Sequence, residues 1–109
     1  MRCVANVKIR LSDAPDALGF GKGIARLLEG VERLGSINKA TREMGMAYSK
    51  AWKIINAVEE EFGVRLIDRD GARGSELTPE AKKLIARYHE MQDAAQAAAE
   101  EVLRKYWEN

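Results

Sequence analysis

Residues 35–63, "GSINKATREMGMAYSKAWKIINAVEEEFG", contain two segments in which apolar residues recur at helical spacing, separated by a glycine. Ser36 is a suitable N-cap for the first segment, and Gly45 is a suitable end. The apolar face of this segment consists of Ile37, Ala40 and Met44. The second segment runs from about Tyr48 to Phe62, and its apolar side is formed by Ala51, Ile54, Ile55, Val58 and Phe62. Two short helices joined by a tight glycine-containing turn predict a helix-turn-helix arrangement.

The opposite side of the second predicted helix is polar. Ser49, Lys53 and Asn56 fall on that side, and Trp52 flanks them at the edge between the two faces. Lysine can donate to guanine acceptors or to phosphate, and asparagine can bond adenine through two atoms. Serine can form a hydrogen bond with either base. From residue 38 to residue 56 the charged residues are Glu43 against Lys39, Arg42, Lys50 and Lys53. The N-terminal half of this helix is therefore predicted to contact the major groove of DNA.

Two strands and a helix are predicted before this pair of helices. Residues 3–11, "CVANVKIRL", alternate between apolar and polar side chains, which predicts a half-buried strand. After a turn-rich stretch, residues 17–20 could form a short returning strand. A first helix closed by Gly35 is predicted from the spacing of Ile24, Leu27, Leu28, Val31 and Leu34.

A small hairpin is predicted after the second helix of the pair. "VRLIDRD" (64–70) has the pattern of a strand, "GARGS" (71–75) that of a glycine-rich loop, and "EL" (76–77) that of a returning strand. Arg69 and Arg73 lie around the tip, where arginine suits phosphates or a minor groove. Such contacts position a protein on DNA more than they read its sequence. Together with the helices, this hairpin predicts a winged helix-turn-helix.

A long helix completes the predicted fold. Thr78 supplies a capping hydroxyl and Pro79 suits the first helical position, so the helix should run from there to about Trp107. Its near-heptad stripe consists of Leu84, Tyr88, Met91, Ala95, Ala98 and Val102. A domain of 109 residues cannot bury the whole stripe, so a second copy of the chain is the predicted partner. The predicted fold is mainly α with a small β component: a winged helix-turn-helix (1–79) and a dimerisation helix (80–109) within one domain.

Composition limits the classes of function. Hydrophobic residues make up 46% and charged residues 32%, as in ordinary globular proteins, and the net charge is +1, so any nucleic-acid role must depend on local clusters. Cys3 and His89, the only cysteine and histidine, provide no disulfide framework, metal-ligand spacing or activated nucleophile. We therefore expect no catalytic residues, no metal and no cofactor. The absence of a membrane-spanning or signal-peptide pattern favours a cytoplasmic protein.

Residues 34–70, followed by "LTPEAKKLI" (77–85), resemble the N-terminal DNA-binding domain of the ModE molybdate-responsive transcription regulators, and more distantly that of the LysR-type regulators. The most specific pieces are "GSI" (35–37), "YSKAW" (48–52), "GVRLIDR" (63–69) and "LTPEA" (77–81). Trp52 is typical of the ModE branch. The resemblance implies that the second and third helices bind DNA, that the wing flanks them and that the long helix dimerises. By position, it assigns DNA contacts to Tyr48, Ser49, Lys50, Lys53 and Asn56 in the recognition helix and to Arg69 and Arg73 in the wing.

The expected function is sequence-specific binding of double-stranded DNA by a homodimeric transcription regulator, with two recognition helices in successive major grooves. ModE regulators have a separate molybdate-binding domain, and nothing in these residues resembles it, so we expect this polypeptide not to sense molybdate itself. One alternative is a protein-interaction module, because Glu59, Glu60 and Glu61 would repel phosphate and suit a basic partner. A metal- or oxyanion-responsive regulator with a ligand at the dimer interface ranks third.

Overall fold

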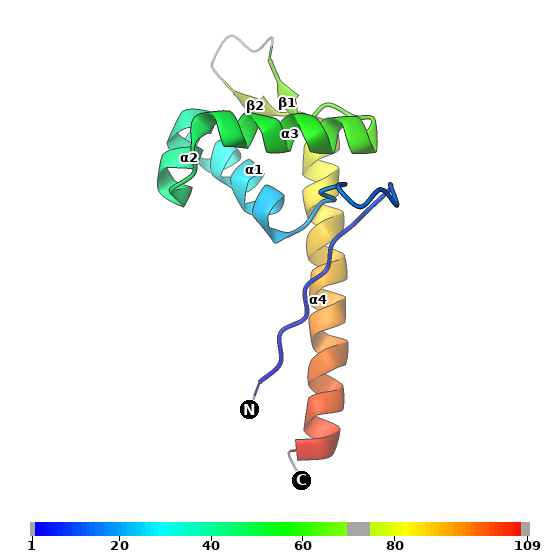
Figure 1. The fold of residues 1–109 in the computed structure, drawn as a ribbon. Helices are drawn as coiled ribbons and strands as arrows, with labels where there is room; N and C mark the ends of the chain where they lie inside the picture. The colour runs from blue at the N-terminus through cyan, green and yellow to red at the C-terminus, as the bar shows by residue number, and fades with distance from the viewer. Residues whose placement is uncertain (1, 70–74, 108–109) are drawn as a thin grey trace.

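The computed structural model describes residues 2–69 and 75–107. Within these residues the chain forms α1 (Lys22–Leu34), α2 (Ile37–Met44), α3 (Tyr48–Phe62), β1 (Ile67–Asp68), β2 (Glu76–Leu77) and α4 (Pro79–Trp107). Figure 1 shows that α1–α3 and the two strands form a head from which α4 projects as a stalk. The predicted fold class, a winged helix-turn-helix with a long C-terminal helix, is confirmed.

The helix-turn-helix has the bounds that the sequence predicts. The Ser36 hydroxyl caps α2 by accepting a hydrogen bond of 3.2 Å from the Lys39 backbone N–H. Gly45 then ends α2 with a φ of 66°, a left-handed conformation that costs glycine little. Because the chain turns at this glycine, α3 can begin three residues later at Tyr48.

The head has a single apolar core between α1, α2 and α3. Its members from these three helices are Ile24, Ala25, Leu27, Leu28, Val31, Ile37, Ala40, Ala51, Ile55 and Val58. Gly30 lets α2 approach α1 closely, since a Cβ at this position would lie 3.2 Å from the Cβ of Ala40. The core thus holds α2 against α1 and supports the buried side of α3.

The wing is a two-stranded antiparallel sheet in which Ile67 pairs with Leu77 and Asp68 with Glu76. The predicted hairpin is confirmed, although β1 has two residues where the sequence pattern suggested seven. It is short because the backbone N–H of Leu66 donates to the Glu59 side chain and not to a neighbouring strand. The predicted tip, with Arg73, lies outside the described residues.

The N-terminal segment runs beside α4 (Figure 1) and alternates between half-buried and exposed side chains, as predicted. The predicted strand itself is wrong: Ile9 and Phe20 form only an isolated antiparallel bridge. Side-chain amides of α4 take the place of a partner strand. Gln92 bonds Val7 N–H at 2.9 Å and Ala5 C=O at 2.6 Å, and Gln96 bonds Ala5 N–H and Cys3 C=O, each at 2.8 Å.

The first three turns of α4 are anchored in the head, and this corrects one predicted dimer residue. Tyr88 is 5% exposed, and its ring packs edge-on against Phe20 at a centroid distance of 6.0 Å. Because the turn before α1 places Phe20 over Tyr88, this tyrosine belongs to the core of its own chain. The rest of the predicted stripe remains accessible: Leu84 and Ala95 are half-buried, and Met91, Ala98 and Val102 are exposed.

Candidate nucleic-acid interface

The two sides of α3 differ as the sequence predicts. Ala51, Ile55 and Val58 are fully buried in the core of the head. On the outer side the side chains are exposed, and these are the predicted contact residues Tyr48, Ser49, Lys50, Lys53 and Asn56. The buried side fixes the helix on the head, so its N-terminal half is free to enter a groove.

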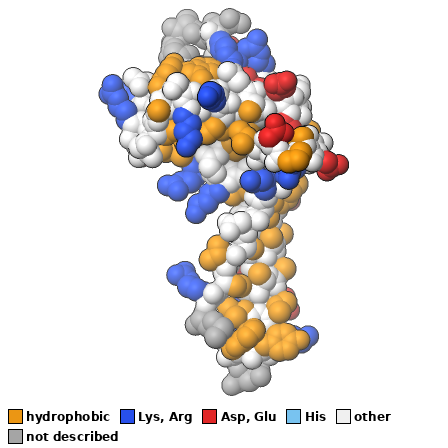
Figure 2. Space-filling model, viewed as in Figure 1, with side chains coloured by type: hydrophobic (Ala, Val, Ile, Leu, Met, Phe, Trp, Pro, Cys, Tyr) orange, Lys and Arg blue, Asp and Glu red, His pale blue; other side chains and the backbone are white. Residues whose placement is uncertain are grey.

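The outer surface of the helix-turn-helix is basic. Among the described residues, no carboxylate forms an ion pair with the exposed side chains Lys39, Arg42, Lys50 and Lys53. The one acidic residue in this part of the sequence, Glu43, is paired with Arg33 of α1 at 2.5 Å. Figure 2 shows lysine and arginine side chains spread over the head, with acidic side chains gathered toward the C-terminal end of α3. This charge distribution leaves the N-terminal half of α3 attractive to phosphate.

The side of α3 that faces the wing carries two aromatic residues. Tyr48 and Trp52 lie one turn apart and contact edge to face, with ring centroids 6.4 Å apart. Trp52 is half-buried and packs against the core, whereas Tyr48 is 50% exposed. The exposed tyrosine extends the polar surface of Ser49 and Lys53, and the tryptophan forms part of the base of the wing.

Arg69, the residue directly after β1, binds α3 instead of projecting freely. Its guanidinium donates to Asn56 Oδ1 at 3.0 Å and to the two carboxylate oxygens of Glu59 at 2.9 and 3.3 Å. The guanidinium carbon also lies 4.8 Å from the centre of the Trp52 ring, a cation–π distance. These contacts join the wing to the recognition helix, and they were not evident in the sequence.

Glu59 is the centre of this connection. Partial burial opposes ionisation of its carboxylate, but hydrogen bonds from Arg69 and from the backbone N–H groups of Leu66 and Ile67 outweigh it. The pKa of Glu59 therefore lies below its usual range. Negative charge near a helix C-terminus is unfavourable with respect to the helix dipole. In the sequence, this unfavourable position is the feature that could have indicated that Glu59 has partners elsewhere.

Glu61 has a similar structural role on the other side of α3. Its carboxylate accepts hydrogen bonds from the backbone N–H of Leu11 at 3.0 Å and of Gly19 at 2.9 Å. These hydrogen bonds lower the pKa of Glu61 and hold the turn between Ile9 and Phe20 against the helix. Two of the three glutamates that suggested a protein-interaction surface are thus engaged within the chain.

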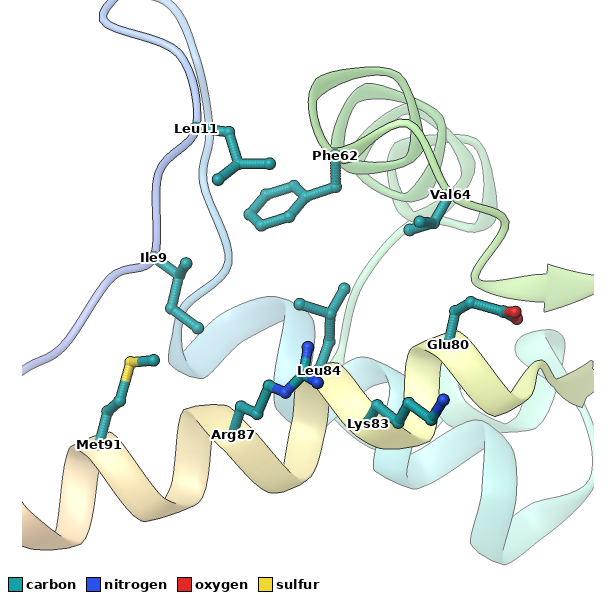
Figure 3. A pocket seen from close by; sticks show the side chains of 9 residues that line it. All are labelled: Ile9, Leu11, Phe62, Val64, Glu80, Lys83, Leu84, Arg87 and Met91. Carbon is teal, nitrogen blue, oxygen red and sulfur yellow. The ribbon is translucent and has the colours of Figure 1, made fainter.

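Two residues of the predicted dimerisation stripe, Leu84 and Met91, line an apolar groove beside the stalk. Figure 3 shows Ile9 and Leu11 from the N-terminal segment and Phe62 from α3 facing the Leu84 side of α4. The groove has a volume of about 370 Å³ and is also lined by Val64, Glu80, Lys83, Arg87 and Met91. Three predicted dimerisation residues outside the head, Met91, Ala98 and Val102, continue this face along α4.

Metal ligands and membrane spans are both missing from the part of the chain that the structure describes. Among these residues, no three or more His, Cys, Asp and Glu side chains come together in a group that could hold a metal ion. None of the helices in the described ranges combines the length and the apolar composition needed to cross a membrane.

Several known proteins are similar to this chain in sequence. It is 34% identical over 77 residues to the molybdenum transport protein ModE of Azotobacter vinelandii, covering 67% of this chain and 28% of that protein. It is 42% identical over 57 residues to the HTH-type transcriptional regulator TdcA of Escherichia coli K12, covering 52% and 18%. The chain thus spans less than a third of the length of these relatives.

Solved structures of other proteins have a similar fold. The structure titled "Crystal structure of CbnR_DBD-DNA complex" superposes with a TM-score of 0.61 at 18% identity, over 76% of this chain and 94% of that one. Residues 25–82, from α1 into α4, match the family described as "Bacterial regulatory helix-turn-helix protein, lysR family". The resemblance to ModE and LysR-type regulators is thereby confirmed, and the chain belongs to the LysR family of bacterial regulatory helix-turn-helix proteins.

Proposed function

We propose that this protein binds double-stranded DNA sequence-specifically and regulates transcription as a homodimer. The observation that carries the proposal is the cluster of exposed polar and basic side chains on the N-terminal half of α3, opposite a fully buried face. In this arrangement Lys50 and Lys53 bind phosphates or guanine acceptors, and Ser49 and Asn56 contact base edges. The family and the DNA complexes of similarly folded domains support the same function.

The wing residues have different roles in this proposal. Arg73 contacts phosphate or a minor groove, as its position in the sequence suggests. Arg69 already has partners on α3, so we assign it to holding the wing. Replacing Arg73 with alanine should weaken binding to all sequences alike, whereas Lys53→Ala should relax preference at particular base pairs by about 1–3 kcal/mol.

The homodimer that we propose forms through the accessible face of α4 and its groove. Pairing the two stalks antiparallel, with Leu84 opposite the partner's Val102, also places Met91 opposite the partner's Ala95. The same register brings Arg87, at the edge of the stripe, beside the partner's Glu101. A parallel pair would instead set Arg87 against the partner's Arg87. Charge complementarity therefore favours the antiparallel arrangement.

The DNA-binding proposal is tested by fluorescence anisotropy with a randomised duplex pool at two salt concentrations. The wild-type affinity should fall steeply with salt through counterion release, and Lys50→Ala/Lys53→Ala should reduce the salt slope by about 1 for each phosphate that is no longer neutralised. The matched control is Lys22→Ala/Arg104→Ala, which removes two exposed cations at the start of α1 and the end of α4. Equal losses of affinity in both double variants, or no binding by the folded wild type, would contradict the proposal.

The dimer is tested separately by analytical ultracentrifugation. Arg87→Glu should dissociate the dimer, and the exchange Arg87→Glu/Glu101→Arg should restore it. Arg104→Glu is the control, because residue 104 lies off the stripe on the helical wheel. Monomeric wild-type protein at micromolar concentration, or an Arg87→Glu variant that still dimerises, would exclude this interface.

A further inference from the structure

The Arg69–Asn56 hydrogen bond determines the orientation of the Asn56 amide. The oxygen and nitrogen of such an amide are nearly equivalent in shape, so their assignment depends on the hydrogen-bond partners. An arginine guanidinium has only donors. The Asn56 atom at 3.0 Å from Arg69 must therefore be the acceptor, Oδ1, and the Nδ2 group is the part left for another partner.

Besides Asn56, three groups hold the guanidinium, one of which is the Ile67 carbonyl oxygen at 3.4 Å. Glu59 binds it through both carboxylate oxygens, and Trp52 lies against it at 4.8 Å. Glu59 in turn is fixed by the backbone of Leu66 at the start of the wing, with an N···O distance of 2.8 Å. The Arg69 and Glu59 side chains are only 32% and 12% exposed. The amide of Asn56 is thus oriented by a hydrogen-bonded cluster of protein groups.

The orientation affects which base asparagine can recognise. Bidentate recognition of adenine needs the amide oxygen to accept from N6 while the nitrogen donates to N7. Here Oδ1 is beside a guanidinium, so a base N–H approaching it would meet positive charge. The two N–H groups of Nδ2, which have no partner among the described residues, instead match adjacent acceptors, which guanine offers at O6 and N7.

We propose that Arg69 is a positioning residue that turns Asn56 into a hydrogen-bond donor, so that the recognition helix selects guanine at the position that Asn56 contacts. This inference rests on the proposed DNA-binding function. It departs from the simple expectation that an arginine in the wing binds phosphate and that an asparagine in the recognition helix reads adenine.

The test is sequencing of duplexes bound from a randomised pool. The position read by Asn56 is the one whose preference disappears in Asn56→Ala, and the wild type should select guanine there. Arg69→Met keeps an unbranched side chain against Trp52 but removes the donor to Oδ1. The adenine-to-guanine ratio at that position should therefore rise by at least about fivefold, which corresponds to the smallest discrimination expected from one bidentate contact. Arg69→Lys should shift it in the same direction, because lysine keeps the charge near Glu59 without the planar fork.

The control is Arg65→Met, which removes the same charge from an exposed residue that has no contact with Asn56 among the described residues. It should leave the preference at that position unchanged, as should Arg69→Met in an Asn56→Ala background. Adenine at this position in the wild type would overturn the inference, as would an Arg69→Met or Arg69→Lys variant that binds all sequences more weakly without a change of preference. No duplex binding by the folded wild type would instead overturn the proposed function, and the inference with it.

Discussion

The Gln92 side chain accepts a hydrogen bond of 2.9 Å from the backbone N–H of Val7, a residue 85 positions earlier in the chain. The same amide donates to Ala5 C=O, so one glutamine satisfies a donor and an acceptor as a neighbouring strand would. Gln96, one turn later in α4, repeats the arrangement toward Ala5 N–H and Cys3 C=O. This ladder ties the N-terminal segment to the stalk.

Removing the ladder should release the N-terminal segment. Gln92→Ala/Gln96→Ala loses four partly buried hydrogen bonds, which should lower the free energy of unfolding by about 1–3 kcal/mol. Amide hydrogen exchange at Ala5 and Val7, followed by NMR, should accelerate at least about tenfold, because local opening becomes easier. Glu100→Ala, at an exposed position of α4, should leave both amides protected. Unchanged exchange in the double variant would show that the ladder is not what holds the segment.

Protonation of Glu59 at low pH should weaken the attachment of the wing to α3. Because its pKa lies below the ordinary value of about 4.3, its ionised form stabilises the fold fully at neutral pH. This contribution is lost as the pH falls through the pKa of the folded protein. Glu59→Gln should therefore lower the melting temperature at pH 7 and reduce its fall between pH 6 and pH 3. The exposed Glu60→Gln should follow the wild type, and a Glu59→Gln curve parallel to the wild-type curve would contradict the prediction.

Tyr88 and Met91 should respond differently to truncation. Tyr88→Ala opens a cavity against Phe20 and should cost about 3–5 kcal/mol of the free energy of unfolding, measured by urea denaturation. Met91 is 46% exposed, so Met91→Ala should leave the stability of the single chain nearly unchanged and weaken association in sedimentation experiments. If Tyr88→Ala lowered only the association and not the unfolding free energy, the assignment of this tyrosine to the core would be wrong.

The Thr78 hydroxyl should contribute to the stability of the fold, because it connects α4 to the wing. The hydroxyl donates to Arg65 C=O at 2.6 Å and accepts from the Ala81 N–H at 3.1 Å. Thr78→Val keeps the shape but loses both bonds, so it should lower stability in thermal unfolding by about 1–2 kcal/mol. Thr78→Ser retains the hydroxyl and should recover most of the difference, whereas an equal loss in both variants would point to packing of the methyl group instead.

The amino-acid sequence by itself determined the helices and the direction of their faces. Local signals suffice for this: Ser36 and Gly45 bound α2, Thr78 and Pro79 begin α4, and the helical spacing of Ala51, Ile55 and Val58 predicts the buried side of α3. The polar side of α3 then followed, because apolar and polar residues on opposite faces of a helix must separate between core and solvent. Family resemblance pointed to the same surface.

The tertiary structure alone decided which polar side chains are free and which are engaged. Glu59 and Glu61 resembled a solvated acidic run, yet one holds the wing and the other the N-terminal turn. The alternation of residues 3–11 indicated a strand, but its partners are the side chains of Gln92 and Gln96. Such contacts join groups far apart in sequence, and a local pattern records only that a residue is polar or apolar. Burial of Tyr88 under Phe20 was decided in the same way, by the path of the chain across α4.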